Sequence, residues 1–198
     1  MLEKETEKNK LLNFYNQMDL GFVDISVNDD LDNVKFKNIQ TSHKKFTPDG
    51  EFIESKSFSL IYQESSGTNK LVDISGPIFD TLSNGRILVI DELDAKLHPL
   101  MTVAIIKLFN NQEYNKNNAQ LIFATHDTNL LKYGEFRRDQ IYFIEKDKYE
   151  ASDLYSLVEY KDKVRKDRSF EKDYISGRYG AIPYIGNLKN ILDNGSDN

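Results

Sequence analysis

An unbroken apolar run that ends in two acids constrains the fold of this chain most. Residues 87–90, Ile-Leu-Val-Ile, are all branched, and Asp91 and Glu92 follow them directly. A continuous run of branched apolar residues is typical of a strand covered on both faces, as in a parallel sheet. Open α/β sheets bind ligands at the carboxyl ends of their strands, so the two acids are predicted to lie at a ligand-binding edge.

The segments that follow continue an α/β pattern. Pro99 suits the first turn of a helix, and residues 100–110 are apolar on nearly all sides, which favours a buried helix. Residues 121–127 indicate a second buried strand, residues 128–134 a short helix and residues 140–147 a third strand. Strands that alternate with helices predict an α/β layer with right-handed crossovers.

The residues before the apolar run predict a different, smaller arrangement. Residues 2–18 have a helical pattern, and residues 22–62 contain three stretches of alternating polarity with a turn signal at 47–51. Such alternation is typical of an antiparallel meander with one wet face. A further helix is expected from about residue 66 to Asn84, because Gly85 is a natural helix terminator.

Composition limits the classes of protein that this chain can belong to. It has 198 residues, a net charge of −6, no cysteine and no apolar run long enough to span a bilayer. Its highly charged N-terminus does not resemble a signal peptide, so a cytoplasmic location and no membrane partner are expected. An acidic chain is a poor general nucleic-acid binder, and residues 161–168, a basic stretch interrupted by acids, fit a solvated face better than a nucleic-acid site.

Three groups of residues could carry chemistry. Asp91 is placed to hold Mg²⁺ through its waters, and Glu92 to polarise an attacking water as a general base. His126 ends the second strand, where it could hydrogen-bond a phosphate, although a lone histidine there can also simply cap a helix. Residues 65–68, Ser-Ser-Gly-Thr, precede a helix and form either an anion site or a plain helix cap.

The order of these groups resembles the second half of an ABC-type ATPase head. Within that class the chain is similar to the AAA15 and AAA_21 group of ATP-binding proteins of bacterial defence and abortive-infection systems. The resemblance is carried by "ESSGTNKL" in place of the ABC signature, "ILVIDELDAKLHP" as Walker B and D-loop, and "AQLIFATHDTNLL" as the H-loop. "RRDQIYFIEKD" and "GRYGAIPYIG" extend it, so that it covers roughly residues 60–188.

The resemblance implies a role for each motif residue. Asp91 would be the Mg²⁺-associated acid, Glu92 the catalytic base and His126 the γ-phosphate switch. Ser66 and Gly67 would contact the γ-phosphate of ATP held by a second head, with Ser65 and Thr68 beside them. Asp94 would lie at the seam between the two heads. The signature departs from the Leu-Ser-Gly-Gly-Gln pattern of transporters, which affects its exact phosphate contacts.

The phosphate-binding loop of this class has no counterpart in the chain. That loop reads G-x-x-x-x-G-K-[ST], and none of the ten glycines here is followed by lysine. Because the loop supplies most of the grip on ATP, the chain alone is expected to bind ATP weakly and not to hydrolyse it. The chain is expected to be the C-terminal half of the ATPase, truncated or encoded by a split gene, with the Walker A half supplied elsewhere.

These inferences define the expected organisation. The fold class is α/β, with the C-terminal part of a P-loop NTPase sheet preceded by a small antiparallel subdomain. Residues 1–62 form the accessory arm, residues 63–190 the C-terminal lobe of the ATPase head, and residues 191–198 a disordered tail. The expected partners are the N-terminal ATPase half, a second head in a homodimer and an effector nuclease, with ATP and Mg²⁺ bound only in the completed head.

Two other functions remain open from the sequence. The chain could be a non-catalytic interaction module derived from an ATPase, in which the 22–62 meander and the tail bind a partner protein. It could also be a nucleic-acid-processing enzyme in which Asp91, Glu92 and Asp94 are direct metal ligands.

Overall fold

The computed structural model describes residues 5–27, 39–132, 136–160, 169–183 and 185. The chain forms two compact units, residues 1–127 and residues 128–198, and each is described by itself. The boundary between the units lies at residues 127 and 128, whereas the domain boundary predicted from the change in polarity pattern lies at residue 62. The basic stretch 161–168 and the tail 191–198 lie outside the described residues, as do residues 33–38 of the second alternating stretch, which was predicted over 33–40.

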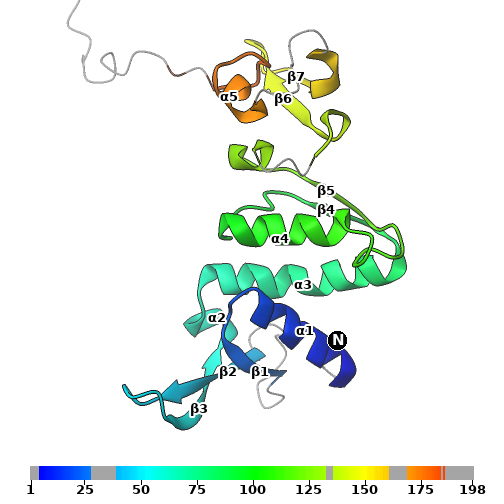
Figure 1. Ribbon diagram of the computed structural model, residues 1–198. Coiled ribbons are helices and arrows are strands. Elements are labelled where there is room, and N and C mark those ends of the chain that lie inside the picture. The colour runs from blue at the N-terminus through cyan, green and yellow to red at the C-terminus, as the bar shows by residue number, and fades with distance from the viewer. Residues whose placement is uncertain (1–4, 28–38, 133–135, 161–168, 184, 186–198) are drawn as a thin grey trace, which may run out of the picture. The chain divides into compact units, whose positions relative to one another are not determined.

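The first unit begins with a helix and an antiparallel meander, as predicted, although residues 41–46 of the second strand lie beyond the alternating stretch 33–40 predicted for it (Figure 1). The elements are α1 (Glu5–Gln17), β1 (Phe22–Val27), β2 (Ile39–Phe46) and β3 (Phe52–Ser59), in the sheet order β1-β2-β3. The turn at 47–51 closes the β2–β3 hairpin, where the Thr47 amide donates to the Glu51 carbonyl. The third strand is shorter than predicted, because a four-residue helix, α2 (Leu60–Gln63), begins directly after Ser59.

An aromatic cluster joins this meander to the longest helix of the unit. That helix is α3 (Ser66–Asn84). Phe14 of α1 meets Phe79 of α3 edge to face at 5.3 Å, and the fully buried Phe22 of β1 lies against Tyr15 at 5.1 Å. Edge-to-face aromatic pairs add to the gain from buried area, so α1 and β1 pack against α3 as one core.

Both ends of α3 have the residues that a helix end requires. Ser65 caps the N-terminus, and Gly85 ends the helix in the left-handed conformation at φ 63°. A Cβ atom at position 85 would also collide with the Asn117 carbonyl, so this position admits only glycine for two reasons. The helix terminator predicted at Asn84-Gly85 is therefore confirmed.

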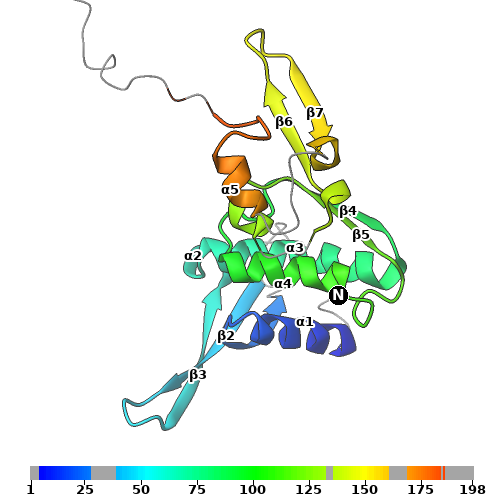
Figure 2. The same ribbon diagram turned by 45° about the horizontal axis from the view of Figure 1, so that its top comes forward.

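A strand, a helix and a parallel strand complete the first unit. They are β4 (Ile87–Ile90), α4 (Pro99–Asn110) and β5 (Gln120–Phe123), and α4 runs alongside α3 (Figures 1 and 2). Pro99 occupies the first turn of α4, and His98 caps it by accepting from the Leu100 amide at 3.2 Å. β4 and β5 pair in parallel with Ile87 opposite Gln120, as the α/β pattern predicts.

The two parallel strands are covered on one face only, which corrects the prediction of two covered faces. Leu88 and Ile90 point toward the core, whereas Ile87 and Val89 are 61% and 70% exposed. On β5, Ile122 is likewise 55% exposed. A single crossover helix can cover only one face of a parallel pair, so the other face of this pair is left open.

The second unit contains its own small sheet, which corrects the prediction of a third parallel strand. β6 (Tyr142–Lys146) pairs antiparallel with β7 (Ser152–Ser156), and α5 (Phe170–Ile175) follows. Three short 3-10 helices, Thr128–Leu131, Arg138–Gln140 and Leu157–Tyr160, complete the described elements. The core consists of Ile141, Phe143, Leu157 and Tyr179, with Tyr174 stacked on Phe143 at 5.3 Å. A tight turn at 147–151 follows β6 at once, so its nearest partner is the next strand in the chain.

Candidate functional site

The two acids follow β4 and begin a tight turn. Asp91 and Glu92 are both exposed, and Glu92 has the left-handed conformation at φ 48°, which is uncommon for a residue other than glycine. The next residue, Leu93, is fully buried, and its amide donates to the Ala124 carbonyl at 3.1 Å. A left-handed residue held between a strand and a buried anchor is typical of a functional turn.

The same turn is tied to the end of β5. The Ala124 amide donates to the Ile90 carbonyl at 3.1 Å, and the His126 amide donates to the Asp94 carboxylate at 3.4 Å. The histidine side chain itself is exposed. The predicted acids and the predicted histidine therefore lie at one edge of the β4–β5 pair, as expected for the carboxyl ends of parallel strands.

The start of α3 is built by its capping residues. The Ser65 hydroxyl accepts from the Thr68 amide at 3.0 Å and lies 2.9 Å from the Thr68 hydroxyl. Thr68 is buried, whereas Ser66 is exposed. Ser65 and Thr68 thus have a local structural task as a helix cap, and their part in nucleotide binding stays a prediction.

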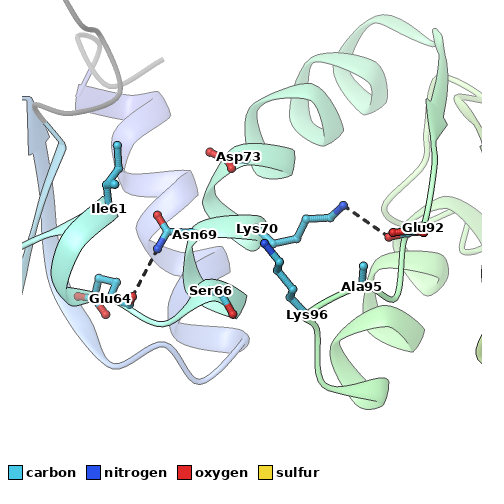
Figure 3. A pocket seen from close by; sticks show the side chains of 9 residues that line it. All are labelled: Ile61, Glu64, Ser66, Asn69, Lys70, Asp73, Glu92, Ala95 and Lys96. Carbon is cyan, nitrogen blue, oxygen red and sulfur yellow. Dashed lines mark hydrogen bonds between the residues drawn. The ribbon is translucent and has the colours of Figure 1, made fainter.

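An open pocket of about 490 Å³ lies between α2, α3 and the turn after β4 (Figure 3). Its walls are formed by Ile61, Glu64, Ser66, Asn69, Lys70, Asp73, Glu92, Ala95 and Lys96. The structure brings two of the predicted site residues together here, namely Ser66 from α3 and Glu92 from the turn. Asp91, Asp94 and His126 are not part of the pocket lining.

The pocket also contains charged residues that belong to none of the predicted motifs, namely Lys70, Asp73 and Lys96. The Lys70 ammonium donates to the Glu92 carbonyl at 3.5 Å, and partial burial raises the pKa of Asp73 although Lys70 and Lys96 both lower it. Lys70 and Asp73 follow Ser66 by four and seven residues, the spacing of one helix face. The sequence spacing could therefore have identified Lys70 and Asp73. Lys96 could not be found in this way, because it reaches the pocket only through the fold of the turn after β4.

Glu64 joins the pocket to the antiparallel meander. Its carboxylate accepts a hydrogen bond from the Thr41 hydroxyl and lies 2.8 Å from Nε2 of His43, both on β2. Its side chain is 13% exposed. The residue directly before the Ser65 cap is therefore held by the sheet of the predicted accessory arm.

The described residues hold neither a cluster of direct metal ligands nor a helix that could span a membrane. In this part of the chain, no three histidine or acidic side chains lie together as a set of direct metal ligands, so Asp91, Glu92 and Asp94 do not form such a set. None of the described helices is both long and apolar enough to cross a bilayer.

A known protein family matches most of the first unit. Residues 11–132, more than half of the chain, match the family described as "AAA domain, putative AbiEii toxin, Type IV TA system". The match begins inside α1, well before the segment on which the resemblance in the sequence rests, and it ends before β6. No curated protein matches the chain.

The match therefore includes the meander and α3 as well as β4 and β5 and the segments after them that contain Asp91 and His126. The fold is mixed α/β with small sheets, and the family implies the P-loop NTPase fold and the use of ATP and Mg²⁺. The chain belongs to this AAA-domain family and carries a nucleotide-binding, ATPase-like domain.

Proposed function

We propose that this chain supplies the catalytic edge of an ABC-class AAA ATPase. In this proposal Glu92 is the general base, Asp91 is the acid associated with Mg²⁺, and His126 contacts the γ-phosphate. The observation that carries the proposal is a set of three hydrogen bonds joining the turn after β4 to the end of β5: two between backbone groups and one from the His126 amide to the Asp94 carboxylate. These bonds hold the acids and the histidine at one edge, where one nucleotide could meet all three.

The donor chemistry of this edge fits Mg²⁺ held through water. Mg²⁺ in phosphate-transfer sites is usually bound by one or two carboxylates together with substrate phosphates and several waters. Asp91 offers an exposed carboxylate at the end of β4, in line with that mode. When bound, the ion would neutralise charge on the phosphates of ATP.

The grip on the nucleotide must come from a phosphate loop that the chain does not contain. We infer that a second polypeptide segment, on this protein or on another, docks on the open face of the β4–β5 pair and brings that loop. The exposed Ile87, Val89 and Ile122 support this docking, because large apolar side chains gathered on one face are typical of an interaction surface. ATP binding and turnover are then properties of the completed head.

The completed head would act as a homodimer. Ser66 and Gly67 would meet the γ-phosphate of ATP bound by the second head, and Asp94 would lie at the seam between the heads. Because the family description names a toxin of a type IV toxin–antitoxin system, we further propose a role in phage defence, with ATP-driven closure relayed to an effector nuclease.

The test combines the chain with a segment that carries a phosphate loop. Alone, the chain should bind Mg-ATP more weakly than micromolar affinity in titration calorimetry and show no turnover. Combined, it should hydrolyse ATP, and Glu92→Gln should lower kcat by about 10²–10⁴-fold while ATP binding persists. Glu113→Gln, a change in an exposed acid of the loop after α4, is the matched control.

One outcome would favour the second candidate, the non-catalytic interaction module. Phe46 and Phe52 face each other next to the turn of the β2–β3 hairpin and are 51% and 56% exposed, as a protein-binding surface requires. If the combined protein bound a partner through this hairpin and ATP turnover were unaffected by Glu92→Gln, the ATPase proposal would be wrong.

A further inference from the structure

Gly67 lies where the backbone of α3 meets the turn after β4. A Cβ atom built at position 67 would stand 2.7 Å from the carbonyl oxygen of Lys96. Real Cβ atoms essentially never come that close to another atom, and the obstacle here is backbone rather than a flexible side chain. The first turn of α3 and the turn 92–97 therefore approach at a distance that only glycine allows.

The turn that Gly67 meets is well defined in itself. Glu92 and Lys96 are both left-handed, at φ 48° and 66°. The Ala95 amide donates to the Glu92 carbonyl at 3.1 Å, and the Leu97 amide donates to the Asp94 carbonyl at 3.0 Å. Leu93 and Leu97 are buried beneath it. A turn anchored in this way transmits a shift of its neighbours rather than absorbing it.

A second contact between the same elements lies one helical turn further along α3. The Lys70 ammonium reaches the Glu92 carbonyl, and Figure 3 shows its side chain extended along the pocket wall toward the turn. Ser66, Lys70, Glu92 and Lys96 thus line one pocket from the two sides of the contact. Two contacts along one helix face fix orientation as well as distance.

We infer that Gly67 is a positioning residue that couples the start of α3 rigidly to the turn carrying Glu92 and Asp94. The inference rests on the proposed function, in which Ser66 acts on ATP of the second head and Glu92 on ATP of its own head. The Gly67–Lys96 contact then joins the two nucleotide sites of the dimer through one chain. Gly67 serves this contact by its missing side chain, in addition to any contact with phosphate.

The first experiment needs no nucleotide and uses the full chain. Gly67→Ala should make the amides of Leu93, Ala95 and Leu97 exchange with deuterium about tenfold faster or more, because the contact must open. The amide of Leu20, which caps α1, should not change. Ser83→Ala, at an exposed position of α3 far from the turn, is the control and should leave all four amides unchanged.

The direction in which Gly67→Ala changes the melting temperature distinguishes the effect of the Gly67–Lys96 contact from the effect of helix propensity. Alanine is ordinarily a better helix residue than glycine, so Gly67→Ala would raise the melting temperature if the site were open. We expect a lower melting temperature instead. Lys96→Gly, which lets the left-handed carbonyl shift, should partly restore both the melting temperature and the slow exchange in the double variant.

The completed ATPase provides the second readout. Gly67→Ala should lower the cooperativity of ATP hydrolysis between the two heads, with a larger effect on kcat than on KM.

If Gly67→Ala does not fold, Lys70→Met provides the test. It should accelerate deuterium exchange at the amides of Leu93, Ala95 and Leu97 by a smaller factor than expected for Gly67→Ala. Unchanged exchange in a folded Gly67→Ala variant, or in Lys70→Met where only that variant folds, would overturn the inference. If exchange becomes faster but the completed head shows no ATPase activity, the proposed function is wrong and the inference about the Gly67 contact stands.

Discussion

The Tyr15 hydroxyl lies 2.7 Å from the Ser75 hydroxyl and joins α1 to the middle of α3 inside the core. The Ser75 hydroxyl also donates to the Val72 carbonyl at 2.8 Å, so the tyrosine is the donor in the bond between them. This arrangement makes the two partners unequal in a mutational test, because only one of them has an alternative partner.

We expect Ser75→Ala to destabilise the chain more than Tyr15→Phe. Tyr15→Phe removes one hydrogen bond and leaves Ser75 bonded to Val72, which should cost about 1 kcal/mol. Ser75→Ala leaves the hydroxyl of the fully buried Tyr15 without its acceptor, which should lower the free energy of unfolding by about 1–3 kcal/mol. Urea unfolding of both variants and of the double variant measures the difference. Equal losses from the two single changes would contradict the assigned donor.

The same tyrosine should make the chain sensitive to alkali. Burial raises the pKa of Tyr15 above its ordinary value of 10.0. The folded state then holds this proton more tightly than the unfolded state, so stability is lost as the pH rises past 10. Tyr15→Phe should show a smaller loss of melting temperature over that range, when each protein is compared with itself at pH 8.

The half-buried Glu64 should contribute more to the free energy of unfolding than a residue of an exposed ion pair does. Glu64→Ala removes the partner of both Thr41 and His43 on β2, and Thr41 is fully buried. We expect a loss of about 1–3 kcal/mol in the free energy of unfolding. Glu54→Ala, which breaks the exposed pair with Lys45 on the neighbouring strands, is the control and should cost less than about 1 kcal/mol. If Glu64→Ala and Glu54→Ala lowered the free energy of unfolding by similar amounts, Glu64 would contribute no more than an exposed charge.

Asp73 should lower stability at neutral pH. Burial raises the pKa of this carboxyl above its ordinary value of 3.8, so the folded state binds its proton more readily than the unfolded state. Stability from this group is therefore present in acid and is lost as the pH rises through and above 3.8. Asp73→Asn should raise the melting temperature at pH 7 and change it less near pH 4. A larger gain at pH 4 would contradict the direction of this pKa shift.

Val89 should matter for assembly and not for the fold of the chain itself. Its side chain is 70% exposed on the open face of β4, so Val89→Asp should change the melting temperature of the isolated chain little. In the proposed complex the same change should weaken binding of the phosphate-loop segment by about tenfold or more. Ile90→Asp, one residue along and pointing into the core, should instead unfold the chain. Unimpaired complementation by Val89→Asp would exclude this face as the docking surface.

Much of the first unit follows from local sequence signals. The cap at Ser65, the terminator at Gly85, the proline at the start of α4 and the alternation in β1 and β3 each act on neighbouring residues only. Such signals place helices and turns correctly because their physical cause lies within a few residues. They also place the acids directly after β4, whereas His126 lies beyond Phe123, the last residue of β5. The lengths of β3 and β5 were predicted less well, since strand ends depend on what pairs with them.

The sequence by itself determined α1, α3, α4 and the approximate positions of β1, β4 and β5, placed Asp91 and Glu92 directly after a strand, and lacks the G-x-x-x-x-G-K-[ST] pattern of a phosphate loop. Only the tertiary structure decided which elements meet. It placed Lys70, Asp73 and Lys96 around Ser66 and Glu92, tied Glu64 to Thr41 and His43, and paired β6 with β7 instead of with β5. Contacts between residues far apart in the chain depend on how whole elements pack, and no pattern within one element carries that information.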